Sequence, residues 1–192
     1  RVLTSALGLL ERTDGPIVLE DFPEDAPTQN INAAWSLPFD LPVPPKPKTS
    51  VEWAQALSEE MALVRPWWDK ARARHGRTAV GVSSQAPEAW PDYASAFLDG
   101  KLPAPPAPLT SPAYGLRFLA DDLKSFYFEA AQANGTVPSP TQVNPWFFHT
   151  TLAGAFLIAL REMSLASPDK GLNVAGGRFL VPANWLPQVR EA

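Results

Sequence analysis

Proline placement is the feature that most limits what this chain can fold into. Prolines make up 22 of the 192 residues, and two tracts, residues 38–47 and 103–112, are especially rich in them. Each proline fixes its own φ and removes a backbone donor, so neither tract can form a regular helix or a central strand. We expect the first tract to be extended and irregular, and the second to be a stiff connection between two halves.

The window between the tracts carries the signals of a long helix. Thr49 and Glu52 have the spacing of a capping box, and Gly76 is a natural stop. Apolar residues recur between them at spacings of three and four, which predicts one buried face over residues 50–75. That face consists of Trp53, Leu57, Met61, Val64, Trp68 and Ala71. Pro66 lies inside the pattern and is expected to kink or divide the helix after about Val64.

Two further helices complete the expected core. Ser111, just before a proline, opens a helix over 112–134, and Asn144, also before a proline, opens another over 145–166. Gly154 lies between two alanines and would let a neighbouring backbone approach closely. We expect these two helices to pack with the long helix between the tracts.

Shorter elements fill the rest of the chain. We expect helices over 2–12 and 88–100, strands over 17–19 and 77–84, and an irregular apolar tail over 176–187 that packs back onto the body. The predicted fold class is therefore mainly α with minor β, a helical core with proline-rich irregular segments, and α+β is the alternative. We expect an N-terminal half, 1–101, and a C-terminal half, 102–192, to form one compact unit.

Composition excludes several classes of function. The chain has no cysteine, which rules out disulfides, thiolate catalysis and cysteine zinc sites within it and fits a cytoplasmic protein. The formal charge of -4 argues against broad nucleic-acid binding. The longest apolar stretch, residues 146–160, is shorter than the ~20 residues of a membrane-spanning helix. We therefore expect no nucleic-acid partner, no membrane partner, no metal site and no cofactor.

Four carboxylates lie close together in the turn 20–25. Hard cations such as calcium bind several carboxylate oxygens, but the spacing here does not match an EF-hand loop. Pro23 and Pro27 also restrict how the segment could wrap around an ion. A solvated turn stiffened by proline is favoured over a cation site.

Residues 81–85, GVSSQ, have some features of a nucleophile elbow. They follow an expected strand and precede a helix, but Gln85 stands where that motif requires glycine. A serine triad also needs a histidine base, and only His75 and His149 exist. A hydrolase that uses Ser83 or the acidic turn is therefore a minor alternative.

Two surface features have both a functional and a structural interpretation. Basic residues between 65 and 77 flank Trp67 and Trp68, a combination that can contact phosphates or single-stranded nucleic acid. The solvated face of an amphipathic helix is the favoured interpretation. Residues 41–48 hold two overlapping P-x-x-P patterns with lysines, which aromatic grooves recognise. A stiff loop that lies across the protein's own surface is favoured there.

The candidate site residues are Glu20, Asp21, Arg77 and His149. They are the polar groups most closely surrounded by apolar sequence, so burial would shift their pKa values. His149 sits near the start of an apolar segment, where a lone histidine is more often a hydrogen-bonded core residue than a ligand.

Several segments together resemble one protein family. They are VLTSALGLLER, LEDFPEDAP, RPWWDKARARHGRTAVGVS, LRFLADDLKSFYFEAA and WFFHTTLAGAFLIALR. These are similar to the C-terminal part of bacterial proteins grouped with the glycine/sarcosine/betaine reductase selenoprotein B family. The well-known members of that family cleave their substrates with selenocysteine or cysteine.

Because this chain has neither residue, the resemblance implies a supporting role. It implies a segment or subunit that scaffolds or walls a site completed by residues outside the chain. If the whole protein is an enzyme, it would be an oxidoreductase whose redox group lies elsewhere. The chain starts with a helix already under way, so we expect the C-terminal part of a longer protein. The partner would be another chain or the missing N-terminal part. The alternative is a non-enzymatic interaction module that uses aromatic and proline-rich surfaces.

Overall fold

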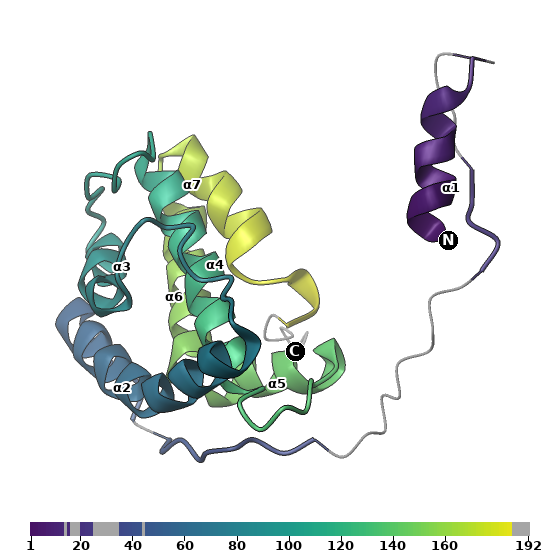
Figure 1. Cartoon of the computed structure of the whole chain (residues 1–192). Helices are drawn as coiled ribbons and strands as arrows, with labels where there is room; N and C mark the ends of the chain where they lie inside the picture. Colours follow the sequence, from purple (N-terminus) through teal and green to yellow (C-terminus); the bar gives the residue numbers. More distant parts are fainter. Residues whose placement is uncertain (14, 16–19, 25–34, 44, 186–192) are drawn as a thin grey trace, which may run out of the picture. The chain divides into compact units, whose positions relative to one another are not determined.

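The structure is a computed structural model that describes residues 1–13, 15, 20–24, 35–43 and 45–185, in two compact units, 1–33 and 34–192. In the first unit, α1 (Val2–Gly8) continues as a 3₁₀ turn, Leu9–Glu11, and all of its residues are exposed (purple in Figure 1). The helix predicted over 2–12 is therefore confirmed. Ion pairs join Arg12 to Glu20 and Arg1 to Glu24 within this unit.

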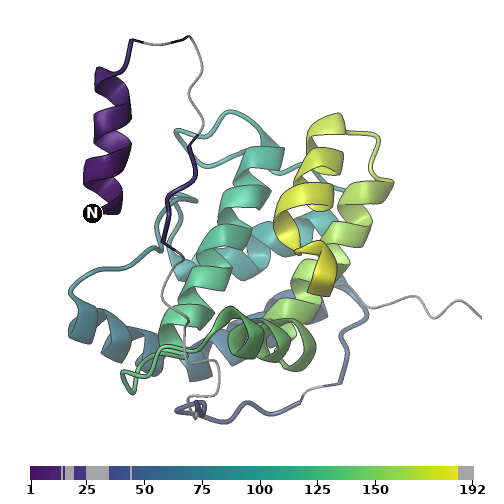
Figure 2. The ribbon, with the colours of Figure 1, turned by 90° about the vertical axis from the view of Figure 1, so that its right-hand side faces the viewer.

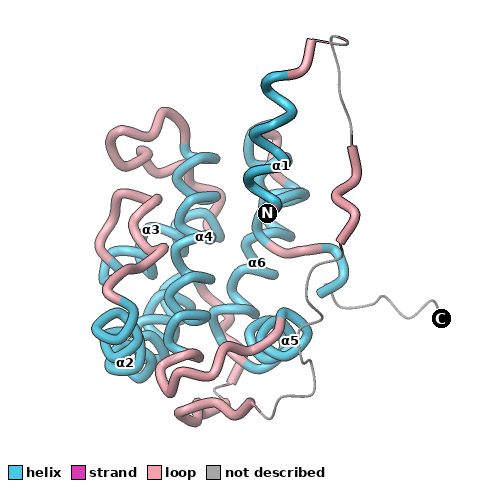
Figure 3. The backbone as a smooth tube through the Cα atoms, turned by 45° about the vertical axis from the view of Figure 1, so that its right-hand side comes forward, coloured by secondary structure: helices cyan, strands magenta, loops and turns pink. Residues whose placement is uncertain are grey.

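The second unit consists of helices and the loops between them. Its helices are α2 (Ser50–His75), α3 (Trp90–Leu98), α4 (Pro112–Ala130), α5 (Pro140–Thr150), α6 (Leu152–Ala166) and α7 (Lys170–Ala175). Short 3₁₀ turns cover Pro87–Ala89 and Ala183–Trp185, and a π-helical turn covers Gly176–Leu180. Figure 3 has no strand among the described residues, which confirms the mainly α prediction. The strand expected over 77–84 is wrong, because that segment forms turns, and the one over 17–19 lies outside the described residues.

The helices of the second unit share one core. α2 packs against α3, α4 and α6, and α7 packs against α4 and α6. Figure 1 shows α2 and α3 on one side of α4 and α7 on the other, and Figure 2 brings α7 to the front. Aromatic pairs such as Trp53 with Phe156 and Trp68 with Phe126 join the layers, with ring centroids 5.3 and 5.0 Å apart. Helices from before and after the proline tract 103–112 thus contribute to the same core.

The caps of α2 form as predicted, but Pro66 does not divide the helix. The Thr49 hydroxyl accepts a hydrogen bond from the Glu52 amide at 3.2 Å, and Gly76 closes the helix with a φ of 68°. The helix runs unbroken through Pro66 because the bond that proline removes falls on its exposed face. On the opposite face, Val64 and Trp68 are buried and hold both parts of the helix in the core.

The single helix predicted over 145–166 is wrong, because the structure has two helices bent by 75°. The first begins earlier than expected, at Pro140, where Ser139 forms a capping box. Pro145 therefore lies inside α5, and Asn144 is not a cap. Thr151 is extended at the break, and its hydroxyl accepts from the Gly154 amide at 2.9 Å. No single described helix is long and apolar enough to cross a membrane, and α5 and α6 reach that length and composition only together, across the bend.

Irregular segments pack onto the helices. The Phe39 ring stacks on Trp67 with centroids 5.7 Å apart, and Trp35 meets Trp146 edge to face. Within residues 41–48, Leu41 packs against the core and Pro47 is buried, whereas Pro42, Val43 and Pro45 are exposed. Both interpretations of that segment therefore stay predictions. At the other end of the chain, Leu180 and Val181 are buried, so the tail packs back as predicted as far as it is described.

Candidate functional site

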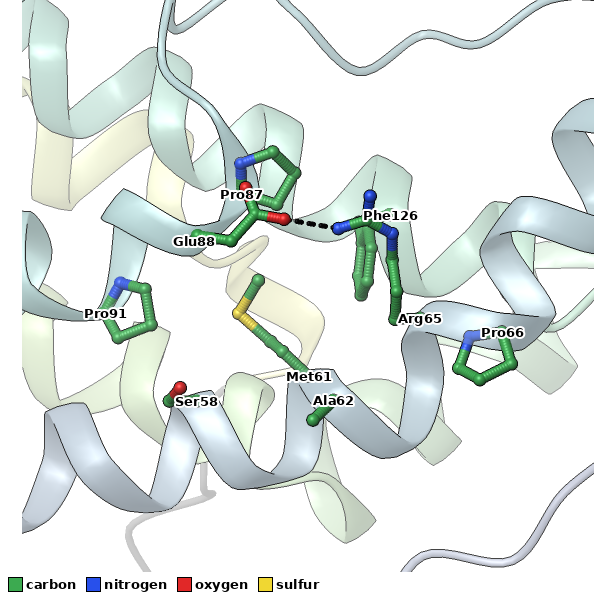
Figure 4. A pocket seen from close by; sticks show the side chains of 9 residues that line it. All are labelled: Ser58, Met61, Ala62, Arg65, Pro66, Pro87, Glu88, Pro91 and Phe126. Atoms are coloured by element: carbon green, nitrogen blue, oxygen red, sulfur yellow. Dashed lines mark hydrogen bonds and ion pairs between the residues drawn. The ribbon is translucent and has the colours of Figure 1, made fainter.

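An apolar pocket lies between α2, α3 and α4. It has a volume of about 340 Å³. Figure 4 shows Met61 at its centre, with Pro91 on one side and Phe126 behind. These three residues are buried and form the floor. The remaining lining residues are Ser58, Ala62, Arg65, Pro66, Pro87 and Glu88. An apolar cavity with a few polar groups at its edge is the usual form of a binding pocket.

An ion pair spans the mouth of this pocket. The Arg65 guanidinium donates to the Glu88 carboxylate at 2.5 Å, drawn as a dashed line in Figure 4. The Glu88 pKa is lowered by a hydrogen bond from its own backbone amide and by the bond from Arg65, so this carboxylate stays charged. The two side chains are 40% and 67% exposed, and such exposed pairs contribute only about 0–1 kcal/mol. Either partner can therefore turn to another charged group at little cost.

The proline in α2 adds a backbone acceptor to the pocket wall. Pro66 has no N–H, so the carbonyl of Ala62, four residues before it, lacks its usual helical donor. Both residues line the pocket and both are exposed. The wall thus presents an oxygen that can accept a hydrogen bond from a bound group.

A second hollow continues the pocket along α2 and α3. It has a volume of about 590 Å³ and shares Ser58, Glu88 and Pro91 with the first. We name the two together the α2–α3 groove. Its charged lining residues are Glu59, Glu88, Asp92 and Asp99 against Arg65 and Lys101, which leaves an excess of two negative charges. Hydrogen bonds from Ser50 and Lys101 lower the pKa of Asp99, so this carboxylate also stays ionised.

The four candidate residues from the sequence are divided between the two units. Glu20 and Asp21 belong to the first unit, and Glu20 pairs with Arg12. Arg77 lines a separate hollow beside His75, and the His149 ring meets Trp185 edge to face at 6.2 Å. All four candidates are exposed, so they are not polar groups enclosed by the core.

The acidic turn brings no metal ligands together in the described residues. Within them, no group of three or more His, Asp or Glu side chains is placed to hold a metal ion. Glu20 and Glu24 each form an ion pair with an arginine, whereas Asp25 lies outside the described residues. The described carboxylates of the turn, Glu20, Asp21 and Glu24, are exposed.

Ser83 is held in a structural role. Its hydroxyl is buried and donates to the Asp122 carboxylate at 2.5 Å. The same carboxylate accepts from the amides of Gly81, Val82 and Ser83 at 2.7–3.0 Å. Asp122 therefore pins the turn that replaces the expected strand, and its oxygens are occupied by these four donors.

The basic residues of α2 and the loop after it lie on an exposed face. Arg72 and Lys70 rest over the rings of Trp68 and Trp67, with the charged atoms 4.5 and 5.2 Å from the ring centroids. Arg65 and Arg72 also pair with Asp69. The Trp67, Trp68 and Asp69 partners all lie on α2 itself, which agrees with a solvated helix face.

Sequence reasoning missed the buried carboxyl group of Glu60. It accepts hydrogen bonds from the amides of Leu152 and Ala153, at 2.8 and 3.0 Å, and from the Tyr127 hydroxyl at 2.8 Å. Burial raises the pKa of Glu60, and these hydrogen bonds oppose the rise. The signal was present in the sequence, because Glu60 lies on the apolar stripe, three residues after Leu57. Asp122 has the same spacing from Leu119 on α4.

Comparisons with protein-family models, curated proteins and solved structures give no match. Functional proposals therefore rest on the geometry above and on the resemblance noted in the sequence. Among the features described, the α2–α3 groove joins a partly enclosed apolar pocket to an open strip of excess negative charge. That combination suits a ligand with an apolar anchor next to positive charges.

Proposed function

We propose that this chain is a binding module whose α2–α3 groove docks a basic segment of a partner polypeptide. The observation that carries the proposal is the continuity of the apolar pocket with the acidic strip, through three shared lining residues. One apolar side chain of the partner fills the pocket over Met61 and Phe126. Lysine or arginine side chains next to it meet Glu59 and Asp92 along α2 and α3.

The polar groups at the pocket suit a polypeptide ligand. The Ala62 carbonyl can accept a backbone or side-chain N–H from the partner, because proline leaves that carbonyl without its helical donor. The Arg65–Glu88 pair can open so that Glu88 receives a cation of the partner. The two best-buried carboxylates, Glu60 and Asp122, are both bonded to backbone amides, so they serve the fold that shapes the groove.

Peptide binding with matched variants tests this proposal. The probe is a short fluorescent peptide with one phenylalanine followed by lysines, and the control peptide has glutamates in place of the lysines. Ala62→Phe fills the pocket from an exposed position, whereas Ala73→Phe adds the same bulk at an exposed position of α2 that does not line the groove. We expect Ala62→Phe to weaken binding about tenfold or more and Ala73→Phe to leave it unchanged.

The acidic strip is tested by neutralising one of its charges. Glu59→Gln should weaken binding and reduce its salt dependence, because the lysines lose a charged partner. Glu162→Gln removes an exposed carboxylate on α6 and serves as the control. Equal binding of the lysine and glutamate peptides, or no effect of Ala62→Phe, would refute the proposal.

We further propose that the partner polypeptide carries the redox group of a selenoprotein B-type reductase. The resemblance in sequence and the absence of cysteine support this assignment, which makes the chain a non-catalytic subunit or segment of a bacterial, cytoplasmic reductase. The test adds the purified chain to a purified selenoprotein B-type subunit and measures complex formation by analytical ultracentrifugation. No complex at micromolar concentrations would refute this assignment but leave peptide binding by the groove standing.

A further inference from the structure

A half-buried cation near the N-terminal end of α4 has no anion beside it. The Nε atom of Arg117 is buried without a hydrogen-bond partner, and no carboxylate of the described residues pairs with the guanidinium. Arg65 and Lys124, by contrast, are paired with Glu88 at 2.5 Å and Asp121 at 2.9 Å. The Nε atom of Arg161 is also buried without a partner, but Arg161 does not line the pocket that Arg117 lines. A buried N–H group without an acceptor is unfavourable, so Arg117 offers donors that a ligand can satisfy.

Two aromatic rings fix the orientation of this guanidinium. Its central carbon lies 3.9 Å from the ring centroid of Phe179 and 5.2 Å from that of Phe118. Phe118 in turn stacks on Tyr114, with an interplanar angle of 17°. Rings that cover the face of a guanidinium leave its edge, which carries the N–H groups, as the side that can bind an anion.

Arg117 lines a pocket of about 260 Å³ between the start of α4 and the α7 region. The pocket wall includes Ser111, the N-cap of α4, Tyr114 in the first turn of α4, and the apolar side chains of Val174 and Phe179. The Ser111 hydroxyl accepts from the Tyr114 amide at 3.2 Å, so its own proton can be donated to a ligand. The volume is several times that of one water molecule and accommodates a small organic molecule.

We propose that this pocket binds a small organic carboxylate. The carboxylate accepts two parallel hydrogen bonds from the edge of Arg117, the geometry in which this side chain binds such groups best. The apolar body of the ligand rests on Val174 and Phe179. The site is separate from the α2–α3 groove and does not depend on the function proposed for it.

The test uses benzoate as the probe, with benzamide as the uncharged match and inorganic phosphate as a different anion. Binding is followed by calorimetry and by the Nε–Hε NMR signal of Arg117. We expect benzoate to shift that signal and to bind at least about tenfold more tightly than benzamide. Arg117→Gln should weaken benzoate binding about tenfold or more, whereas Arg178→Gln, at an exposed neighbouring cation, should not.

A second variant keeps the test decisive if Arg117→Gln fails to fold. Val174→Trp fills the pocket from a half-exposed position and keeps the arginine, so it should also abolish benzoate binding. Binding of benzoate that survives Val174→Trp, or equal binding of benzamide, would overturn the proposal. So would binding of phosphate but not of benzoate, because the ligand would then belong to another chemical class.

Discussion

Replacing Glu60 by alanine should destabilise the fold more than its position on a helix suggests. The carboxylate of Glu60 caps α6 from a helix more than ninety residues earlier, through the amides of Leu152 and Ala153. Without it, two buried N–H groups lose their acceptor, at about 1–3 kcal/mol each. Part of this loss is offset because a buried carboxylate no longer has to be desolvated. We therefore expect the free energy of unfolding to fall by about 3 kcal/mol.

Urea unfolding followed by tryptophan fluorescence measures this change, because Trp53, Trp68 and Trp90 are buried. A loss of about 3 kcal/mol lowers the melting temperature of a chain of this size by about 6–12 °C. The matched control is Glu59→Ala at the exposed neighbouring position, which should change stability by less than about 0.5 kcal/mol. If the two variants unfold at the same urea concentration, the cap on α6 contributes nothing and the reasoning is wrong.

The other predictions concern pH, a loop and a helix crossing. Burial raises the folded-state pKa of Glu60 above its ordinary value of 4.5. The stability of the wild-type protein should therefore fall as pH rises from about 4.5 through the folded-state pKa. A series of urea titrations at different pH values measures this fall, which Glu60→Gln should lack. Asp122→Asn should lose about 2–4 kcal/mol in urea unfolding and speed hydrogen exchange at residues 81–83, whereas Ser83→Ala, which removes one donor, should lose only about 1 kcal/mol. Gly154→Ala should lower the free energy of unfolding by about 1–3 kcal/mol or more, and the melting temperature with it, because the added Cβ would lie 2.0 Å from the Phe147 carbonyl oxygen. An unchanged melting temperature would contradict the close crossing of α5 and α6.

Local signals predicted the ends of several helices. Thr49 and Gly76 of α2 and Ser111 of α4 act as the sequence indicates, because a cap needs only residues within one turn of the helix end. The close approach expected at Gly154 is also present. The start of α5 was misjudged because two prolines, five residues apart, both suit a first helical position, and the capping box at Ser139 selects the earlier one.

The α2–α3 groove was not predictable from the sequence, because its lining residues form no recognisable sequence motif. Met61 was assigned to the buried face of the long helix, and it is buried, yet its neighbourhood with Pro91 and Phe126 depends on how three helices cross. Glu88 and Asp92 are separated from Glu59 by a turn-forming segment whose path Asp122 fixes. Together with Asp99, these residues place four carboxylates along one groove, although no spacing in the sequence indicates that they lie together.

The sequence by itself determined that this is a helical chain without a sulfur nucleophile, because apolar periodicity, caps and composition act through near neighbours. The tertiary structure decided where the helices break and which carboxylates are buried. Pro66 leaves α2 intact because residues on both sides of it are buried in the core. The break between α5 and α6 lies where Glu60, distant in sequence, accepts hydrogen bonds from buried amides at the start of α6. Hydrogen-bond acceptors and packing contacts of that kind come from distant segments, so only the folded chain could reveal them.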